Sequence, residues 1–176
     1  MSIANTGTVV VRQARPADVR AIFDLVRPYA DARILVAKEL IDYFEAVQEF
    51  VLAELRTGEG PTRVVGCGAL HVLWDDIAEV RTLAVDPAVR GTGAGHRLLE
   101  ALVARARDLG LRRLFCLTFE VDFFTRHGFR VIEGTPVGTD VYQEMLRSHD
   151  DGVAEFLDLA RAKPNTLGNT RMLLEL

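Results

Sequence analysis

The segment from residue 78 to residue 109 constrains the fold more than any other part of the chain. Residues 78–85 have the apolar and β-branched content of a strand, and Asp86-Pro87 ends it because proline cannot donate to a ladder. A glycine-rich loop follows, with the sequence Arg90-Gly91-Thr92-Gly93-Ala94-Gly95. Beyond it, apolar residues recur at helical spacing until Gly110, a residue typical of a C-terminal cap. This order predicts a strand, a loop and a helix, with the glycines placed where the helix begins.

A loop of this kind predicts an anion-binding site. The first N–H groups of a helix have no partner within it, and the helix dipole favours negative charge there. Glycines let phosphate oxygens approach the backbone, and Arg90 adds a cation. A dinucleotide fingerprint does not fit, because His96 stands where its third glycine belongs, and the Gly-Lys-Ser/Thr of a P-loop is absent. The pattern predicts a pyrophosphate site, with a loop whose glycines only permit a tight turn as the alternative.

The rest of the chain alternates between strand and helix patterns. Further strands are expected at 9–11, 50–55, 64–74, 113–118, 129–132 and 172–176. Further helices are expected at 16–26, 38–49, 122–126, 141–147 and 153–160, and residues 163–169 are expected to form a loop. The helix at 38–49 would bury Leu40, Ile41, Phe44 and Val47, and the helix after the glycine loop Ala94, Leu98, Leu102, Val103, Ala106 and Leu109. No linker or repeat divides the chain, so residues 1–176 are expected to form one domain with helices covering a central mixed sheet.

Composition narrows the class of partner. The net charge is −4, which argues against a nucleic-acid-binding surface. The two cysteines, Cys67 and Cys116, lie in apolar strand patterns, which favours a reducing compartment. The first eight residues lack the apolar core of a signal peptide, and the apolar run 64–74 is too short to span a bilayer. The four histidines show no zinc-ligand spacing. We therefore expect a cytoplasmic protein without a metal site and without a nucleic-acid or membrane partner.

The glycine loop and the strand before it resemble the cofactor motif of the GNAT superfamily of N-acetyltransferases. Residues 123–129, Phe-Phe-Thr-Arg-His-Gly-Phe, resemble the later motif of that superfamily, which closes on the thiol end of the cofactor. The resemblance implies the GNAT fold, an α/β domain with a mostly antiparallel central sheet flanked by helices, and acetyl-CoA as the acetyl donor. It also implies that the strand before the loop splays from its neighbour and binds the pantetheine arm through its backbone. The cofactor-binding residues expected on this basis are Leu83, Ala84, Val85, Arg90, Gly91, Thr92, Gly93, Ala94, Gly95 and Phe124.

Several segments resemble the acetyltransferase domain of N-acetylglutamate synthases more closely. They are residues 38–50, 66–70, 78–87, 114–118 and 169–173, and the Leu-Phe-Cys-Leu-Thr run at 114–118 is the most specific of them. The resemblance implies acetyl transfer to the α-amino group of L-glutamate, at the first step of arginine biosynthesis. L-glutamine is left open as a further acceptor, because the chain departs from the family. The chain departs from many such synthases because it has no room for an amino-acid-kinase-like domain, and its region 134–162 is longer than the usual connection.

The resemblance assigns catalytic roles to Glu79 and Leu83. Glu79 would be the general base, since a substrate ammonium must lose a proton before it attacks. The N–H of Leu83 would stabilise the oxyanion. An unbroken strand would place Glu79 and Leu83 on the same face, about 13 Å apart, so that water relays the proton. The alternative is a strand carboxylate that is solvated or paired with Arg81. Phe124 takes the place of a tyrosine acid, and the possible substitutes Tyr142, His127 and Cys116 are better explained as structural residues.

The substrate-binding residues implied by the resemblance are Lys38, Thr118, Asn169 and Arg171. Lys38 stands where an arginine is expected, so a bidentate grip on a carboxylate becomes a point-charge contact that would also admit glutamine. The alternative is that Lys38 and Arg171 are solvated surface residues. The expected partner is a small-molecule amino acid, and a homodimer is left open. Two other functions remain: acetylation of another small amine or a protein lysine, and non-catalytic binding of acetyl-CoA, against which Glu79 speaks.

Overall fold

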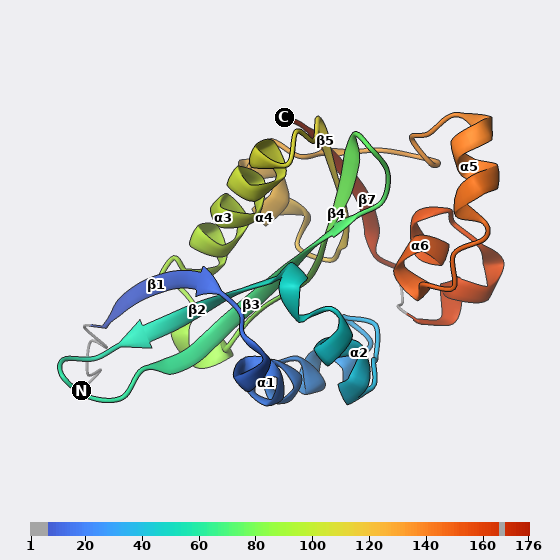
Figure 1. Cartoon of the computed structure of the whole chain (residues 1–176). Helices are drawn as coiled ribbons and strands as arrows, with labels where there is room; N and C mark the ends of the chain where they lie inside the picture. Colours follow the sequence, from blue (N-terminus) through green and yellow to red (C-terminus); the bar gives the residue numbers. More distant parts are fainter. Residues whose placement is uncertain (1–6, 166–167) are drawn as a thin grey trace.

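A seven-stranded sheet with helices on both faces forms the protein in a computed structural model that describes residues 7–165 and 168–176 (Figure 1). The strand order is β1-β2-β3-β4-β5-β7-β6, and all neighbours are antiparallel except β4 and β5. The strands are β1 (Thr8–Gln13), β2 (Phe50–Arg56), β3 (Arg63–Val72), β4 (Ile77–Val85), β5 (Arg113–Thr118), β6 (Arg130–Val131) and β7 (Thr170–Glu175). The prediction of an α/β fold with a mostly antiparallel sheet is confirmed.

The helices fall into three groups around this sheet (Figure 1). The α-helices are α1 (Val19–Asp31), α2 (Leu40–Glu45), α3 (Ala94–Asp108), α4 (Val121–Arg126), α5 (Thr139–Met145) and α6 (Asp151–Phe156). Short 3-10 helices are η1 (Pro16–Asp18), η2 (Val47–Glu49), η3 (Pro87–Val89) and η4 (Ala160–Asn165). No helix in the described ranges is long and apolar enough to cross a membrane.

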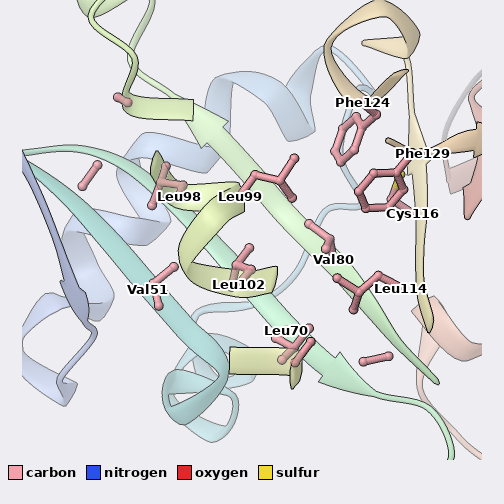
Figure 2. Close-up of a cluster of buried hydrophobic side chains, with 14 of the residues drawn as sticks. Val51, Leu70, Val80, Leu98, Leu99, Leu102, Leu114, Cys116, Phe124 and Phe129 are labelled. Atoms are coloured by element: carbon pink, nitrogen blue, oxygen red, sulfur yellow. The ribbon is translucent and has the colours of Figure 1, made fainter. Parts of the chain in front are cut away.

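Helix α3 packs along one face of the sheet and forms the largest core (Figure 2). Leu98, Leu99 and Leu102 are fully buried against strand residues that include Val51 and Val80. The helix ends before Gly110, as predicted, and Gly110 has a φ of +78°. Gly110 N donates to Arg107 O and Leu111 N donates to Ala106 O, which is the hydrogen-bond pattern of a Schellman motif. The expected apolar stripe is wrong at its end, because Leu109 is 55% exposed after the last turn.

The opposite face is covered by two separate helical groups. Helices α1 and α2 cover the half of the sheet around β2 and β3, and the segment 139–165, which contains α5 and α6, covers the half around β5 and β7. The buried cluster between the first group and the sheet includes Ile22 and Phe50. The cluster between the second group and the sheet includes Phe115 and Phe156, whose rings meet edge to face at 4.9 Å. Strand β4 contributes to both clusters, so the boundary between the two groups crosses this strand.

Two local expectations need correction. In the helix expected at 38–49, Val47 is buried as predicted and Tyr43 is buried as well, whereas Ile41 is 60% exposed and Phe44 is exposed. Leu40, Tyr43 and Val47 also have helical spacing, and the Tyr43 ring packs edge to face on Phe23 at 5.8 Å. In the loop expected at 163–169, residues 163–165 belong to η4, and residues 166–167 lie outside the described residues.

Helix α3 offers a matched test of this packing. We expect Leu102→Ala to lower the free energy of unfolding by about 2–5 kcal/mol, because the cavity left among buried residues cannot collapse fully. Leu109→Ala, in the same helical region but exposed, should change it by less than about 0.5 kcal/mol. Urea unfolding followed by circular dichroism measures both, and equal effects in the two variants would contradict the packing.

Candidate active site

Strands β4 and β5 pair over only three positions and then separate. Their parallel register joins Ile77 to Arg113, Ala78 to Leu114 and Glu79 to Phe115. Beyond this point β4 continues to Val85 beside β3, and β5 continues to Thr118 beside β7. No β4–β5 pair beyond Glu79 and Phe115 occurs in the part of the chain that the structure describes. The splay expected from the resemblance is confirmed, and it leaves one edge of β4 open for an extended ligand to bind the backbone.

A β-bulge at Thr82 shifts the alternation of side chains along β4 by one residue. Thr82 has a φ of +53°, and the register runs from Ala69 opposite Arg81 to Cys67 opposite Ala84, so β4 has one residue more than β3. Leu83 and Val85 therefore point towards the core around α3, while Glu79 and Arg81 point towards the other face. The expectation that Glu79 and Leu83 share a face is wrong, because it assumed an uninterrupted alternation along the strand.

The glycine loop lies between η3 and the start of α3, as predicted. Gly91 and Gly93 have φ values of +83° and +80°, and a Cβ built on either would meet nothing within 4 Å. Gly93 is the N-cap of the 15-residue α3, and its carbonyl accepts the first intrahelical bond from Arg97 N at 3.0 Å. The preceding amides of the first turn therefore have no acceptor within the helix. Arg90 is exposed beside them. This open, amide-rich and cationic surface fits a pyrophosphate.

Two backbone carbonyls of β4 accept hydrogen bonds from side chains on α1 and on β3. The Tyr29 hydroxyl donates to the carbonyl of Val85, at 2.5 Å, and Cys67 Sγ donates to the Thr82 carbonyl at 3.4 Å. Tyr29 was not among the expected site residues. Leu83 and Ala84 lie on the stretch of β4 beyond its last pair with β5, where the resemblance places the pantetheine arm.

The later motif puts Phe123, rather than Phe124, next to the glycine loop. The Phe124 ring is buried with Phe129 in the α3 core (Figure 2), and its role in cofactor binding stays a prediction. Phe123 lies 3.6 Å from the position of a Cβ on Gly95. His127 donates through Nδ1 to the Phe123 carbonyl at 2.8 Å and shares a hydrogen bond with His96 at 2.6 Å. The 31 residues between the two histidines hide this contact from a sequence pattern.

A pocket of about 60 Å³ lies on the opposite face, between the two helical groups. Its walls come from the α1–α2 loop, from β4 and β5, from α6 and from the residues before β7. Three of the predicted substrate or catalytic residues line it: Lys38, Glu79 and Asn169. Thr118 is not among its lining residues; it is buried, and its hydroxyl accepts a hydrogen bond from Glu120 N at 2.8 Å.

Glu79 is held at this pocket in an ion network with buried Arg81 and half-buried Asp150. It is 5% exposed, and its Oε2 accepts a hydrogen bond of 2.6 Å from Nε of Arg81, which is 8% exposed. The two Nη atoms of Arg81 donate to the two carboxylate oxygens of Asp150 at 3.1 and 2.6 Å. Burial would lower the pKa of Arg81, but the charges of Glu79 and Asp150 raise it above its ordinary value. Burial opposes ionisation of Asp150, but its bonds to Arg81 lower its pKa to about 2.

Arg171 lines a neighbouring pocket of about 260 Å³, which shares Leu117, Glu155 and Asn169 with the first. Its guanidinium donates to the carbonyls of Gly134, Glu155 and Phe156 and lies 4.9 Å from the centre of the Phe115 ring. Burial lowers its pKa. Arg171 therefore joins β7 to the end of α6, and the structure does not place it in the pocket that contains Glu79.

Of the other titratable side chains near the site or considered as a catalytic acid, His71 and Tyr142 have polar partners and the two cysteines are buried. His71 lies opposite Glu79 on β3, and its Nδ1 lies 2.8 Å from Glu49 Oε1. The Tyr142 hydroxyl donates to the Leu157 carbonyl at 3.4 Å. Both cysteines are free and buried, and burial raises the pKa of the Cys67 thiol to about 12 and that of Cys116 well above its usual range. Among residues 7–165 and 168–176, no group of three or more potential ligands could hold a metal ion.

A splayed strand pair, an anion loop at a helix start and a buried carboxylate on the splayed strand are the features of an acyl-CoA-dependent transferase. The acetyltransferase (GNAT) family matches residues 18–129, which is most of the chain, so the chain belongs to this family. The family uses acetyl-CoA as the acetyl donor, which confirms the cofactor that the sequence predicts.

Relatives that are named more specifically share more than the fold. An amino-acid acetyltransferase from Mycobacterium tuberculosis is 59% identical over 167 residues, which cover 95% of this chain and 94% of that protein. The crystal structure of Rv2747 from Mycobacterium tuberculosis, in complex with CoA and NLQ, has a TM-score of 0.90 at 59% identity and covers 95% of this chain and 99% of its own.

Longer relatives match the chain over part of their length. The amino-acid acetyltransferase of Aeromonas salmonicida is 34% identical over 136 residues, which are 72% of this chain and 30% of that protein. The N-acetylglutamate synthase from Neisseria gonorrhoeae, complexed with coenzyme A and N-acetyl-glutamate, has a TM-score of 0.73 at 24% identity and covers 96% of this chain and 35% of its own. At that identity the second comparison shows the fold alone.

The exposed arginine of the glycine loop can be tested by direct binding. We expect Arg90→Ala to weaken CoA binding by about tenfold or more, because one charge-assisted bond to phosphate contributes about 1.5–3 kcal/mol. Arg20→Ala, which changes another exposed arginine, on α1, should leave the Kd unchanged. Isothermal titration with CoA measures both, and an unchanged Kd for Arg90→Ala would remove this side chain from the site.

Proposed function

We propose that this protein transfers the acetyl group of acetyl-CoA to the α-amino group of L-glutamate, with L-glutamine as a second substrate. The resemblance places this reaction at the first step of arginine biosynthesis. The observation that carries the proposal is the position of Glu79, a buried carboxylate that lines a pocket on the same strand whose open edge faces β5. The name and the 59% identity of the mycobacterial relative support an amino acid as the acceptor.

The pocket has the charges that such an acceptor requires. A free amino acid brings an ammonium and at least one carboxylate, and a partly dry pocket must satisfy both. Glu79 offers an acceptor for the ammonium, and Lys38 offers a cation for a carboxylate. Asn169 lines the same pocket. Arg171 is assigned to the substrate only through the adjoining pocket, since its described contacts are to backbone carbonyls.

The chemistry follows from these positions. Acetyl-CoA supplies an acetyl thioester at the opening between β4 and β5. Glu79 takes a proton from the substrate ammonium through water, which frees the amine to attack. The N–H of Leu83, on the stretch of β4 that does not pair with β5, donates to the thioester oxygen as charge develops there. The C–S bond then breaks as the C–N bond of the amide is complete, and the attacking nitrogen gives its proton to water. With a phenyl ring at Phe124, the CoA thiolate leaves without a side-chain acid and takes a proton from water, and a thiol pKa of about 8.5 makes this acceptable.

A panel of amines separates this proposal from the alternatives. The purified protein would be incubated with acetyl-CoA and each of glutamate, glutamine, other amino acids, a polyamine and a lysine peptide, and the products identified by mass spectrometry. We expect N-acetylglutamate and N-acetylglutamine as the main products. Exclusive acetylation of another amine would overturn the substrate assignment, and CoA binding without any product would indicate a non-catalytic domain.

The role of Glu79 can be tested by an isosteric change. We expect Glu79→Gln to lower kcat by about 10²–10⁴-fold, because a positioned base contributes about that much, while the KM for acetyl-CoA stays within about twofold. Glu45→Gln, an exposed carboxylate on α2, is the control and should leave kcat unchanged. Steady-state kinetics at several pH values measure both variants. Wild-type turnover of Glu79→Gln across the pH range would eliminate the base.

The role of Lys38 can be tested through the choice of acceptor. We expect Lys38→Ala to raise the amino-acid KM by about tenfold or more, the size of one lost charge-assisted bond, with the acetyl-CoA KM unchanged. Lys38→Arg should restore binding and favour glutamate over glutamine, because a guanidinium grips a carboxylate through two bonds. Kinetics with both amino acids measure the ratio, and an unchanged KM in Lys38→Ala would refute the contact.

A further inference from the structure

We infer that Arg81 is a positioning residue for the proposed base and that Asp150, on the segment 139–165, completes this unit from the other side of the pocket. The inference rests on the proposed role of Glu79. It assigns a function to the part of the chain that is longer than the usual connection of N-acetylglutamate synthases. Asp150 lies 69 residues from Arg81 and is brought to it only by the packing of α6 against the sheet.

The guanidinium of Arg81 binds one carboxylate on each of its sides. Its Nε donates to Oε2 of Glu79, and its two Nη atoms bind the Asp150 carboxylate in a bidentate arrangement. Within the described part of the chain, Oε1 of Glu79 accepts no hydrogen bond. Arg81 thus fixes the Glu79 carboxylate through one oxygen and leaves the other for the proton of the substrate.

The segment 139–165 is shaped to hold Arg81 in this position. A Cβ built on Gly152 would lie 2.3–2.7 Å from three guanidinium atoms of Arg81, so a larger residue there would displace the guanidinium from this position. Asp150 is also the N-cap of α6, where its Oδ1 accepts a bond of 2.8 Å from Val153 N. The start of α6 therefore lies directly against the guanidinium, and Gly152 and Glu155 continue as a wall of the pocket.

The charges explain why a second carboxylate is needed. If Arg81 faced Glu79 alone, its full positive charge would hold the Glu79 carboxylate ionised and oppose the uptake of a proton. Asp150 shares that charge, so the three side chains together have one net negative charge at the pocket. The charged groups of the other elements at this site are Lys38, Glu155 and Arg171, together with the His71–Glu49 pair. Among the described residues, Asp150 is the one that binds Arg81 through two hydrogen bonds.

Asp150→Asn tests the inference because an asparagine still caps the helix while its charge is gone. We expect kcat to fall by about tenfold to a hundredfold, since the base is then held by an unshared cation. The acid side of the kcat/KM pH profile should move to lower pH, because the unshared cation favours ionised Glu79. The KM for acetyl-CoA should stay within about twofold. Asp151→Asn, the neighbouring exposed carboxylate, is the matched control and should behave as wild type.

A second variant keeps the test decisive if Asp150→Asn fails to fold by circular dichroism. Arg81→Lys keeps a cation beside Glu79 but cannot bind both carboxylates through one rigid fork. We expect it to lose at least about tenfold in kcat. Wild-type rates and an unshifted profile in the folded Asp150→Asn variant, or full activity of Arg81→Lys, would overturn the inference. If Glu79→Gln is also fully active, the proposed base itself is at fault rather than its positioning.

Discussion

The separation of β4 from β5 is the constraint on which the rest of the structure depends. A sheet that continued its ladder past Glu79 and Phe115 would satisfy every backbone group of β4 and leave no edge for a ligand. The bulge at Thr82 contributes to this geometry, because bulges bend a strand and increase its local twist. It also turns the side chains of Leu83 and Val85 into the core around α3. That anchoring holds the open backbone edge beside the glycine loop.

The local parts of this arrangement could be predicted from the sequence. The strand, the glycine loop and helix α3 follow one another within about thirty residues, and each has its own signal in proline, glycine or helical spacing. The sequence also predicts the bounds of β5, Arg113–Thr118, to the residue. The loop glycines were informative because their positive φ values are accessible at low cost only to glycine.

The remaining parts could not be predicted, for physical reasons that differ between residues. Thr82 adopts a positive φ without being glycine, so no composition signal marks the bulge that reverses the faces of Glu79 and Leu83. Tyr43 and Ile41 both fit a helical face, and only the shape of the space beside Phe23 selects the first. Asp150 and Arg81 are 69 residues apart in the sequence and meet only through tertiary packing. Periodic patterns in a single sequence indicate local structure and do not indicate such long-range contacts.

The network of Glu79, Arg81 and Asp150 also has a cost that bears on its purpose. Removing charged groups from water costs several kcal/mol for each ion, and apolar replacements of similar size are often as stable or more so. The cluster of Ile77, Phe115 and Phe156 shows that apolar packing is available on this face of the sheet. The segment 139–165 nevertheless places a carboxylate and a bare glycine backbone against Arg81. Glu79 and Arg81 are buried and Asp150 is half-buried, at the wall of a pocket and on or beside the strand that opens towards β5. A costly arrangement of charges at this place supports the proposed role of Glu79 as a base.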